Sequence, residues 1–243
     1  LNEANAASGN RFSAYTQDAF STYLEKVNAL KDSVTKYESD IIEAVSEKEY
    51  QLTLQLVEEI KEVSEVMYYA QKQSGSKNYR DEYMAKNTAW LHEYFGGAKI
   101  VLWAHNFHVS DYLAAGSMGH HLKADFPDDY VTIGFLFSKG HFMAVTQTGE
   151  QFQGLNLQSL EDDPKPGSIN DVMSRANVPV FSVKLSDLQN HDTWRQAFLQ
   201  RIEYFHMGAL YTNKPSDYYD VFNATYFDRL IYFNRTTASV QVK

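Results

Sequence analysis

The stretch Lys99-Ile100-Val101-Leu102-Trp103-Ala104-His105-Asn106-Phe107-His108-Val109 joins a continuous apolar run to a group of polar side chains. An uninterrupted apolar run that follows a glycine, here Gly97, is typical of a strand buried on both faces, as in a parallel sheet covered by helices. In open α/β sheets, ligands bind beyond the carboxyl ends of the strands. We therefore predict a strand over residues 99–104 that ends at a functional site.

The polar residues at this strand end are suited to hydrolytic chemistry. His105 and His108 are of the residue type that most often acts as a general base at neutral pH. Asn106 can donate an amide hydrogen bond to a developing oxyanion, and Phe107 can line an apolar cleft. A His-x-x-His pair can equally well cap a strand without any catalytic role, so the pair alone leaves both interpretations open.

A metal site is the alternative use of two histidines and a nearby carboxylate. The spacing of His105 and His108 argues against it, because ligands on one helix face are normally four residues apart and those on one strand face two apart. We therefore predict no metal and no cofactor. His120 and His121 are adjacent, so on a helix they point in different directions and are interpreted as surface or packing residues.

The sequence beyond the strand end alternates between helical and strand patterns. We predict a mostly parallel central sheet flanked by helices, an α/β fold, with residues 77–243 forming the core portion that carries the strand end. The predicted helices cover 118–126, 168–175 and 193–200, and the further strands cover 130–137, 141–146, 179–184 and 229–233.

The N-terminal part of the chain has a different pattern. Residues 13–73 contain no Gly or Pro, and apolar residues recur at three- and four-residue steps, as in Phe20, Leu24 and Val27. This period predicts long amphipathic helices, and we interpret residues 1–76 as a helical arm or insertion. Another helix is expected over 78–94, ending at Gly96-Gly97, a pair suited to a left-handed C-terminal cap.

Composition limits the class of partner. The chain has 243 residues and a net charge of -9, which repels nucleic acid and anionic lipid headgroups. It has no cysteine, so thiol nucleophiles and Cys-ligated zinc are excluded, but the cellular compartment stays open. No apolar stretch reaches the roughly 18 residues of a transmembrane helix. We expect neither nucleic acid nor membrane as a partner.

Arg80-Asp81 lies in the helix that leads toward the His105 segment. The arginine can hold a carboxylate or an oxyanion in the same pocket, or the two residues can form a solvated pair on the helix surface. The residues alone are compatible with both interpretations, a ligand-binding arginine and a surface ion pair. Because no Gly-x-Ser-x-Gly, Walker or Gly-x-Gly-x-x-Gly motif occurs, serine hydrolases and nucleotide-binding enzymes are disfavoured.

Two segments together resemble the central motifs of the erythromycin esterase family. The first is Arg80-Asp81-Glu82-Tyr83-Met84-Ala85-Lys86-Asn87 with Trp90-Leu91, and the second is Val101-Leu102-Trp103-Ala104-His105-Asn106-Phe107-His108-Val109. Later blocks of the same family are matched in order by 118–122, 130–135 and 226–232. The resemblance extends from about Tyr79 to Thr237, and its most specific element is Trp-Ala-His-Asn-x-His-Val.

This resemblance implies an ester hydrolase that activates water with a histidine and needs no metal. The known examples are antibiotic-resistance enzymes that open macrolide lactones, so a small-molecule ester or lactone is the implied substrate. His105 and His108 match the two histidines of the family's active-site strand end, and Arg80 matches its cleft arginine. We accordingly assign catalytic roles to His105, His108 and Arg80, and substrate binding to Asn106 and Phe107.

The chain departs from the family at its N-terminal end. Family members carry a Gly-Glu-x-x-His-Gly-like segment whose Glu and His are the presumed general base and its partner, and residues 1–73 contain nothing similar. We therefore expect this chain to be the C-terminal portion of a larger protein, with the absent segment as an intramolecular partner. The alternatives are a non-catalytic module that binds a small molecule or a protein, and a metal-dependent hydrolase.

Overall fold

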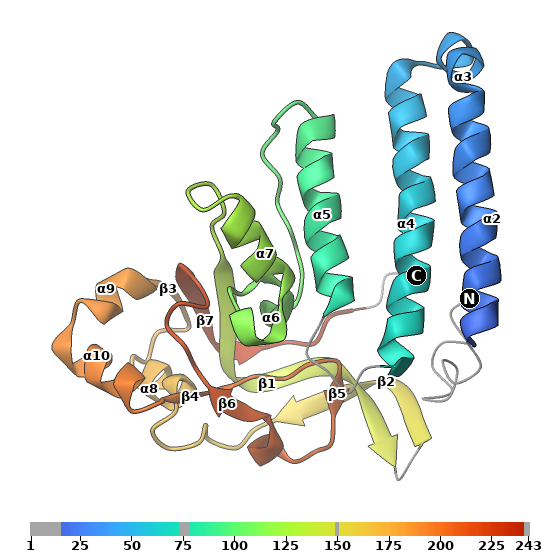
Figure 1. The fold of residues 1–243 in the computed structure, drawn as a ribbon. Coiled ribbons are helices and arrows are strands. Elements are labelled where there is room, and N and C mark those ends of the chain that lie inside the picture. Colours follow the sequence, from blue (N-terminus) through green and yellow to red (C-terminus); the bar gives the residue numbers. More distant parts are fainter. Residues whose placement is uncertain (1–15, 73–77, 149–150, 241–243) are drawn as a thin grey trace. The chain divides into compact units, whose positions relative to one another are not determined.

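The computed structural model describes residues 16–72, 78–148 and 151–240, and these fall into two compact units (Figure 1). The helical unit lies within residues 9–87, and the sheet unit within residues 88–243. Helix α5 (Tyr79–Tyr94) contributes residues to both.

The helical unit consists of long helices, as the sequence predicts. Its elements are α2 (Gln17–Lys36), α3 (Glu38–Ala44), α4 (Glu47–Lys72) and the first half of α5. The prediction is confirmed over residues 16–72, whereas 13–15 and 73 lie outside the described residues. Helix α2 begins where the Thr16 hydroxyl accepts a hydrogen bond from the Ala19 N–H at 3.2 Å, which satisfies one of the unpaired donors of the first turn.

Aromatic and aliphatic side chains join α2 to α4. The ring of Phe20 stacks on that of Tyr68 with centroids 4.0 Å apart, and Val27, Tyr50 and Val57 are buried with them. Phe20 and Val27 lie at the three- and four-residue steps that predict the apolar face of α2. Burial of this stripe holds the two helices together.

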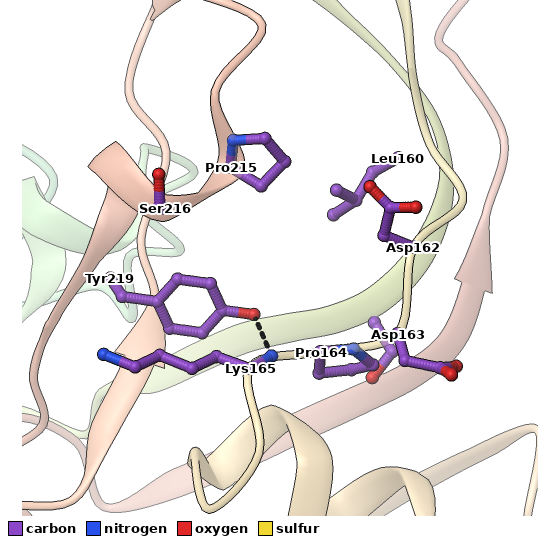
Figure 2. Close-up of a pocket in the computed structure, with 9 residues that line it drawn as sticks. Leu160, Asp162, Asp163, Pro164, Lys165, Pro215, Ser216 and Tyr219 are labelled. Atoms are coloured by element: carbon purple, nitrogen blue, oxygen red, sulfur yellow. Dashed lines mark hydrogen bonds between the residues drawn. The ribbon is translucent and has the colours of Figure 1, made fainter.

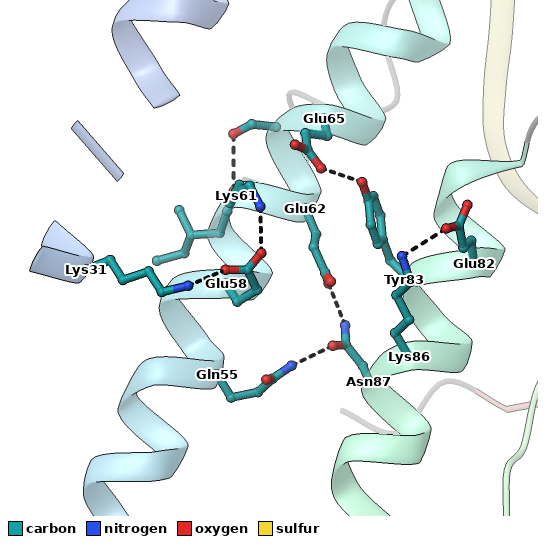
Figure 3. A network of polar contacts seen from close by, with 12 residues as sticks. Lys31, Gln55, Glu58, Lys61, Glu62, Glu65, Glu82, Tyr83, Lys86 and Asn87 are labelled. Atoms are coloured by element: carbon teal, nitrogen blue, oxygen red, sulfur yellow. Dashed lines mark hydrogen bonds and ion pairs between the residues drawn. The ribbon is translucent and has the colours of Figure 1, made fainter. Parts of the chain in front are cut away.

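Polar contacts join α4 to both of its neighbours (Figure 3). The Glu58 carboxylate accepts from Lys31 of α2 at 3.1 Å and from Lys61 at 2.7 Å, and the bond from Lys61 is the main cause of a lowered Glu58 pKa. Asn87 of α5 accepts from Gln55 at 2.6 Å and donates to Glu62 at 2.9 Å. The first half of α5 is thereby fixed to α4.

The sheet unit contains a mixed sheet rather than the mostly parallel one that we expected. Its strand order is β2-β1-β7-β3, and β5 also pairs with β1. The pairings of β1 with β7 and β5 are parallel, whereas β1 with β2 and β3 with β7 are antiparallel. The strands are β1 (Ile133–Thr148), β2 (Gln151–Leu160), β3 (Val180–Lys184), β5 (Leu210–Tyr211) and β7 (Arg229–Thr236).

The antiparallel pairing of β1 with β2 has a local cause. Only residues 149–150 separate β1 from β2, and a connection of that length can join antiparallel strands but not parallel ones. The regions expected as separate strands over 130–137 and 141–146 form the single long strand β1. The predicted strands near 179–184 and 229–233 are confirmed as β3 and β7.

The prediction of a strand over residues 99–104 is wrong. Residues 98–105 have no regular secondary structure, and Val101 and Trp103 are 90% and 85% exposed. A strand requires a neighbour that pairs with its backbone N–H and C=O groups, and no strand in the described part of the chain pairs with this segment. The apolar run indicates a preference for burial, but it cannot supply the partner strand.

The remaining helices flank the sheet. The predicted helices over 118–126, 168–175 and 193–200 are confirmed as α7 (Met118–Asp125), α8 (Ile169–Ser174) and α10 (Asp192–Leu199). Helices α6 (Asn106–Val109) and α8 contact β1. The shorter elements are η1 (Leu113–Ala115), α9 (Leu185–Gln189), β4 (Glu203–Phe205), η2 (Pro215–Tyr218) and β6 (Tyr219–Val221).

Gly119 allows α7 to pack closely against the backbone of Val109 and Ser110, at the end of α6. A Cβ at this position would lie 2.1 Å from the carbonyl oxygen of Val109 and 2.5 Å from that of Ser110. Both oxygens belong to the backbone, so a side chain cannot be accommodated by a rotamer change. The packing of α7 therefore sets the position of the chain directly after α6.

We predict that Gly119→Ala lowers the free energy of unfolding by about 1–3 kcal/mol, as overpacking of a dense interior does. Urea denaturation followed by circular dichroism measures this. Gly208→Ala is the matched control, because a Cβ there would meet nothing within 4 Å. Equal stability of the two variants would show that α7 is not closely packed against residues 109–110.

Candidate functional site

His105 is held in one tautomer by two hydrogen bonds. Its Nδ1 accepts from the backbone N–H of Phe107 at 3.2 Å, and its Nε2 lies 2.6 Å from the carbonyl oxygen of Met207. A backbone N–H can only donate and a carbonyl can only accept, so the ring proton is on Nε2. The side chain is thus a neutral imidazole that caps the N-terminus of α6 and contacts the segment after β4.

The surroundings favour this neutral state. Desolvation by neighbouring protein atoms lowers the pKa of His105, although the residue as a whole is exposed. The hydrogen bond to Met207 opposes this shift, and the nearby His108 adds to it. His105 is therefore set up at neutral pH as a hydrogen-bond donor through Nε2.

Asn106 fixes α6 to the edge of β1. Its side-chain Nδ2 donates to the carbonyl oxygen of Phe135 at 2.7 Å, and its Oδ1 accepts from the Phe135 N–H at 2.9 Å. This exchange copies the hydrogen bonds that a neighbouring strand would make. One N–H of the amide and its oxygen are therefore engaged in positioning the turn.

His108 and Phe107 lie on the same short helix. The His108 N–H donates to the His105 carbonyl at 2.9 Å, and the His108 and Phe107 rings meet edge to face with centroids 5.2 Å apart. Both side chains are partly buried. The structure thus gathers His105, Asn106, Phe107 and His108 on one turn, next to β1 and the segment after β4.

Arg80 is exposed on α5. Its Nη1 lies 3.9 Å from Oδ1 of Asp81, and the Asp81 side chain is almost fully buried. Arg80 belongs to the helical unit and the histidines to the sheet unit. That the Arg80 side chain lies in one cleft with His105 and His108 stays a prediction.

His206 is a neighbour of the site that sequence reasoning missed. Its ring centroid is 5.1 Å from that of His105, and its ring stacks on that of Tyr204 with centroids 5.2 Å apart. Its buried Nε2 has no hydrogen-bond partner in the described part of the chain, and burial is the main cause that lowers the pKa of His206 to about 4. No motif surrounds this residue, and only the tertiary fold places it beside His105.

Asp111 and His120 form a second pair that received no role from the sequence. His120 Nδ1 is 2.7 Å from Asp111 Oδ1, and both side chains are partly exposed. The pair connects the turn after α6 to the first turn of α7, where Ser117 caps the helix by accepting from the His120 N–H. The contact stabilises the local fold.

The described residues contain no group of three or more His, Asp or Glu side chains arranged to hold a metal ion. In the same residues, no helix combines the length and the apolar character needed to cross a membrane. Two hollows lie in the sheet unit, and none of the sequence-predicted site residues lines either of them. The predicted cleft at His105 and His108 stays a prediction.

Solved structures share this mixed α/β fold. A protein from Bacillus cereus matches 94% of this chain and 55% of its own length, with a TM-score of 0.72 and 18% identity. A succinoglycan biosynthesis protein (TM-score 0.61, 17% identity) covers 92% of this chain and 56% of its own. An erythromycin esterase mutant in an open conformation (TM-score 0.59, 18% identity) matches 89% of this chain and 53% of its own length.

Sequence comparison defines the family. The family model described as erythromycin esterase matches residues 2–236, and the chain belongs to that family. A curated relative, erythromycin esterase type II from Escherichia coli, is 26% identical over 113 residues, which cover 43% of this chain and 27% of the relative. The chain spans about half the length of the solved structures that it resembles.

The buried neutral state of His206 predicts a pH dependence of stability. Its pKa is depressed from 6.5 to about 4 in the folded state, so between these pH values the unfolded chain binds a proton that the folded chain does not. The free energy of unfolding should fall as the pH drops through this window, by at most about 3 kcal/mol from this residue.

His206→Phe keeps a ring against Tyr204 and removes the titrating group, so its unfolding free energy should change less between pH 6.5 and 4. His191→Phe changes an exposed histidine between α9 and α10 and serves as the control. The measurement is a series of urea denaturation curves across this range. The same slope in wild type and His206→Phe would contradict the buried neutral state.

Proposed function

We propose that this chain is the C-terminal part of a hydrolase that opens a carboxylic ester or a lactone by attack of water, with a histidine as general base. Membership of the erythromycin esterase family supports the hydrolase class. The name of the Escherichia coli relative supports an ester as the substrate. The observation that carries the proposal is the neutral His105, held at the N-terminus of α6 with an Nε2–H that can donate to an oxyanion.

The proposed reaction assigns separate tasks to the histidines. A base takes a proton from water, the water oxygen bonds to the ester carbonyl carbon, and the carbonyl oxygen becomes an oxyanion. The intermediate then collapses, the bond to the alcohol oxygen breaks, and this oxygen receives a proton. In this scheme the base is a histidine N-terminal to residue 1, as the family resemblance implies.

His105, His108 and Arg80 orient the substrate and stabilise the developing charge. The Nε2–H of His105 is the donor that would turn from the Met207 carbonyl to the oxyanion. Asn106 contributes its second amide hydrogen, since the first is bonded to Phe135. Phe107 provides an apolar surface for the substrate.

A non-catalytic binding module is the second candidate function. It is favoured by the fact that both ring nitrogens of His105 are engaged in intramolecular hydrogen bonds. In that case the same turn binds a small molecule without hydrolysing it. Activity measurements distinguish the two functions.

We predict that the 243-residue chain alone hydrolyses aryl esters and macrolides slowly or not at all. The same chain extended by the residues encoded upstream should hydrolyse at least one of them, since a general base contributes about 10²- to 10⁴-fold. Steady-state turnover of both proteins on one ester panel is the measurement. Equal activity of the two proteins would place the base within these 243 residues.

In the extended protein, His105→Ala and His108→Ala should each lower kcat/KM by about 10²-fold or more, because a donor to the oxyanion is lost. His191→Ala is the matched control on the exposed turn between α9 and α10. Full activity of both site variants would remove this turn from the mechanism. Binding of an ester without turnover by the extended protein would instead favour the binding module.

A further inference from the structure

A hollow of about 320 Å³ lies at the end of β2, among residues that the proposed function does not use. Leu160 and the loop that follows it form one side, and Pro215 and Ser216 of η2 form the opposite side (Figure 2). Tyr219 closes a third side. A volume of this size accommodates a small organic molecule.

The walls of this hollow are rigid. Pro164 and Pro215 have a fixed φ, and Pro164 and Leu160 are buried. The Tyr219 hydroxyl accepts a hydrogen bond from the backbone N–H of Lys165 at 2.8 Å, which fixes the ring against the loop (Figure 2). A ligand would therefore find the walls preorganised and would lose little affinity in ordering them.

Of the charged residues that line the hollow, all but one form ion pairs. Asp163 is 2.7 Å from the Lys139 ammonium, and Glu161, which precedes the lining residues in the same loop, forms a bidentate pair with Arg235 at 2.9 and 2.6 Å. Lys165 pairs with Glu203.

Asp162 is the exception, since its carboxylate has no hydrogen-bond or ion-pair partner in the described part of the chain. In Figure 2 its carboxylate lies on the side opposite Pro215, and the Lys165 ammonium extends away from it. The hollow thus combines apolar walls with one uncompensated negative charge at its rim.

We propose that this hollow binds a small organic ammonium ion whose charge meets Asp162 and whose apolar body lies between Pro215 and the Tyr219 ring. A cation is preferred to a neutral ligand because the neighbouring ion pairs leave a single negative charge unmatched. The carboxylate is exposed, so its contribution is modest and the affinity is millimolar. This site is independent of the hydrolase chemistry at His105.

The test uses the 243-residue chain and two probes of the same shape, benzylammonium and benzyl alcohol. Heteronuclear NMR titration follows the backbone amides, and the proposal expects saturable shifts at Lys165, Ser216 and Tyr219 with benzylammonium. Benzyl alcohol should bind about fivefold more weakly or worse, because it lacks the charge. Equal affinity for the two probes, or an absence of shifts at these amides, overturns the proposal.

Asp162→Asn and Asp163→Asn provide a matched pair of variants. Asp162→Asn should weaken benzylammonium binding about fivefold and leave benzyl alcohol unchanged, since it removes only the charge that the probe meets. Asp163→Asn removes a charge in the same loop, but this charge already pairs with Lys139. The affinity of this variant for benzylammonium should therefore stay within about twofold of that of the wild type. If the two variants behave alike, the carboxylate of Asp162 is not the recognition group.

Discussion

The candidate site depends on one exchange of hydrogen bonds, between the side-chain amide of Asn106 and the backbone of Phe135. The amide supplies the donor and the acceptor that a neighbouring strand would present to β1 at this point. It thereby fixes α6 to the sheet although residues 98–105 form no strand. The packing of Gly119 against the carbonyl of Val109 supports the same turn from its other end.

Fixing α6 also determines the chemistry available to His105. The ring caps α6 through Nδ1, so its proton must be on Nε2, where the Met207 carbonyl accepts it. A protonated His105 could not accept from the Phe107 N–H, and desolvation by the surrounding protein lowers the pKa of the His105 ring. Local capping and tertiary contacts therefore both favour a neutral hydrogen-bond donor over a charged imidazolium.

Local signals predict much of the fold and part of the site. The glycine-free period over 17–72, the helical pattern over 168–175 and the apolar pattern of β7 lie within single elements, and each is found in the structure. The strand over 99–104 fails because pairing depends on a partner elsewhere in the chain. His206 and Met207 were not foreseen for the same reason, since only tertiary folding brings the segment after β4 to His105.

The hydrogen bonding of the site is tested most directly by the tautomer of His105 in solution. Long-range ¹H–¹⁵N NMR of the imidazole nitrogens, assigned by the signal lost in His105→Gln, measures it at neutral pH. We expect a neutral ring with a protonated, pyrrole-like Nε2 and an unprotonated, pyridine-like Nδ1. A ring protonated on Nδ1, or one that carries a positive charge at neutral pH, would show that His105 does not cap α6 as a neutral Nε2–H donor.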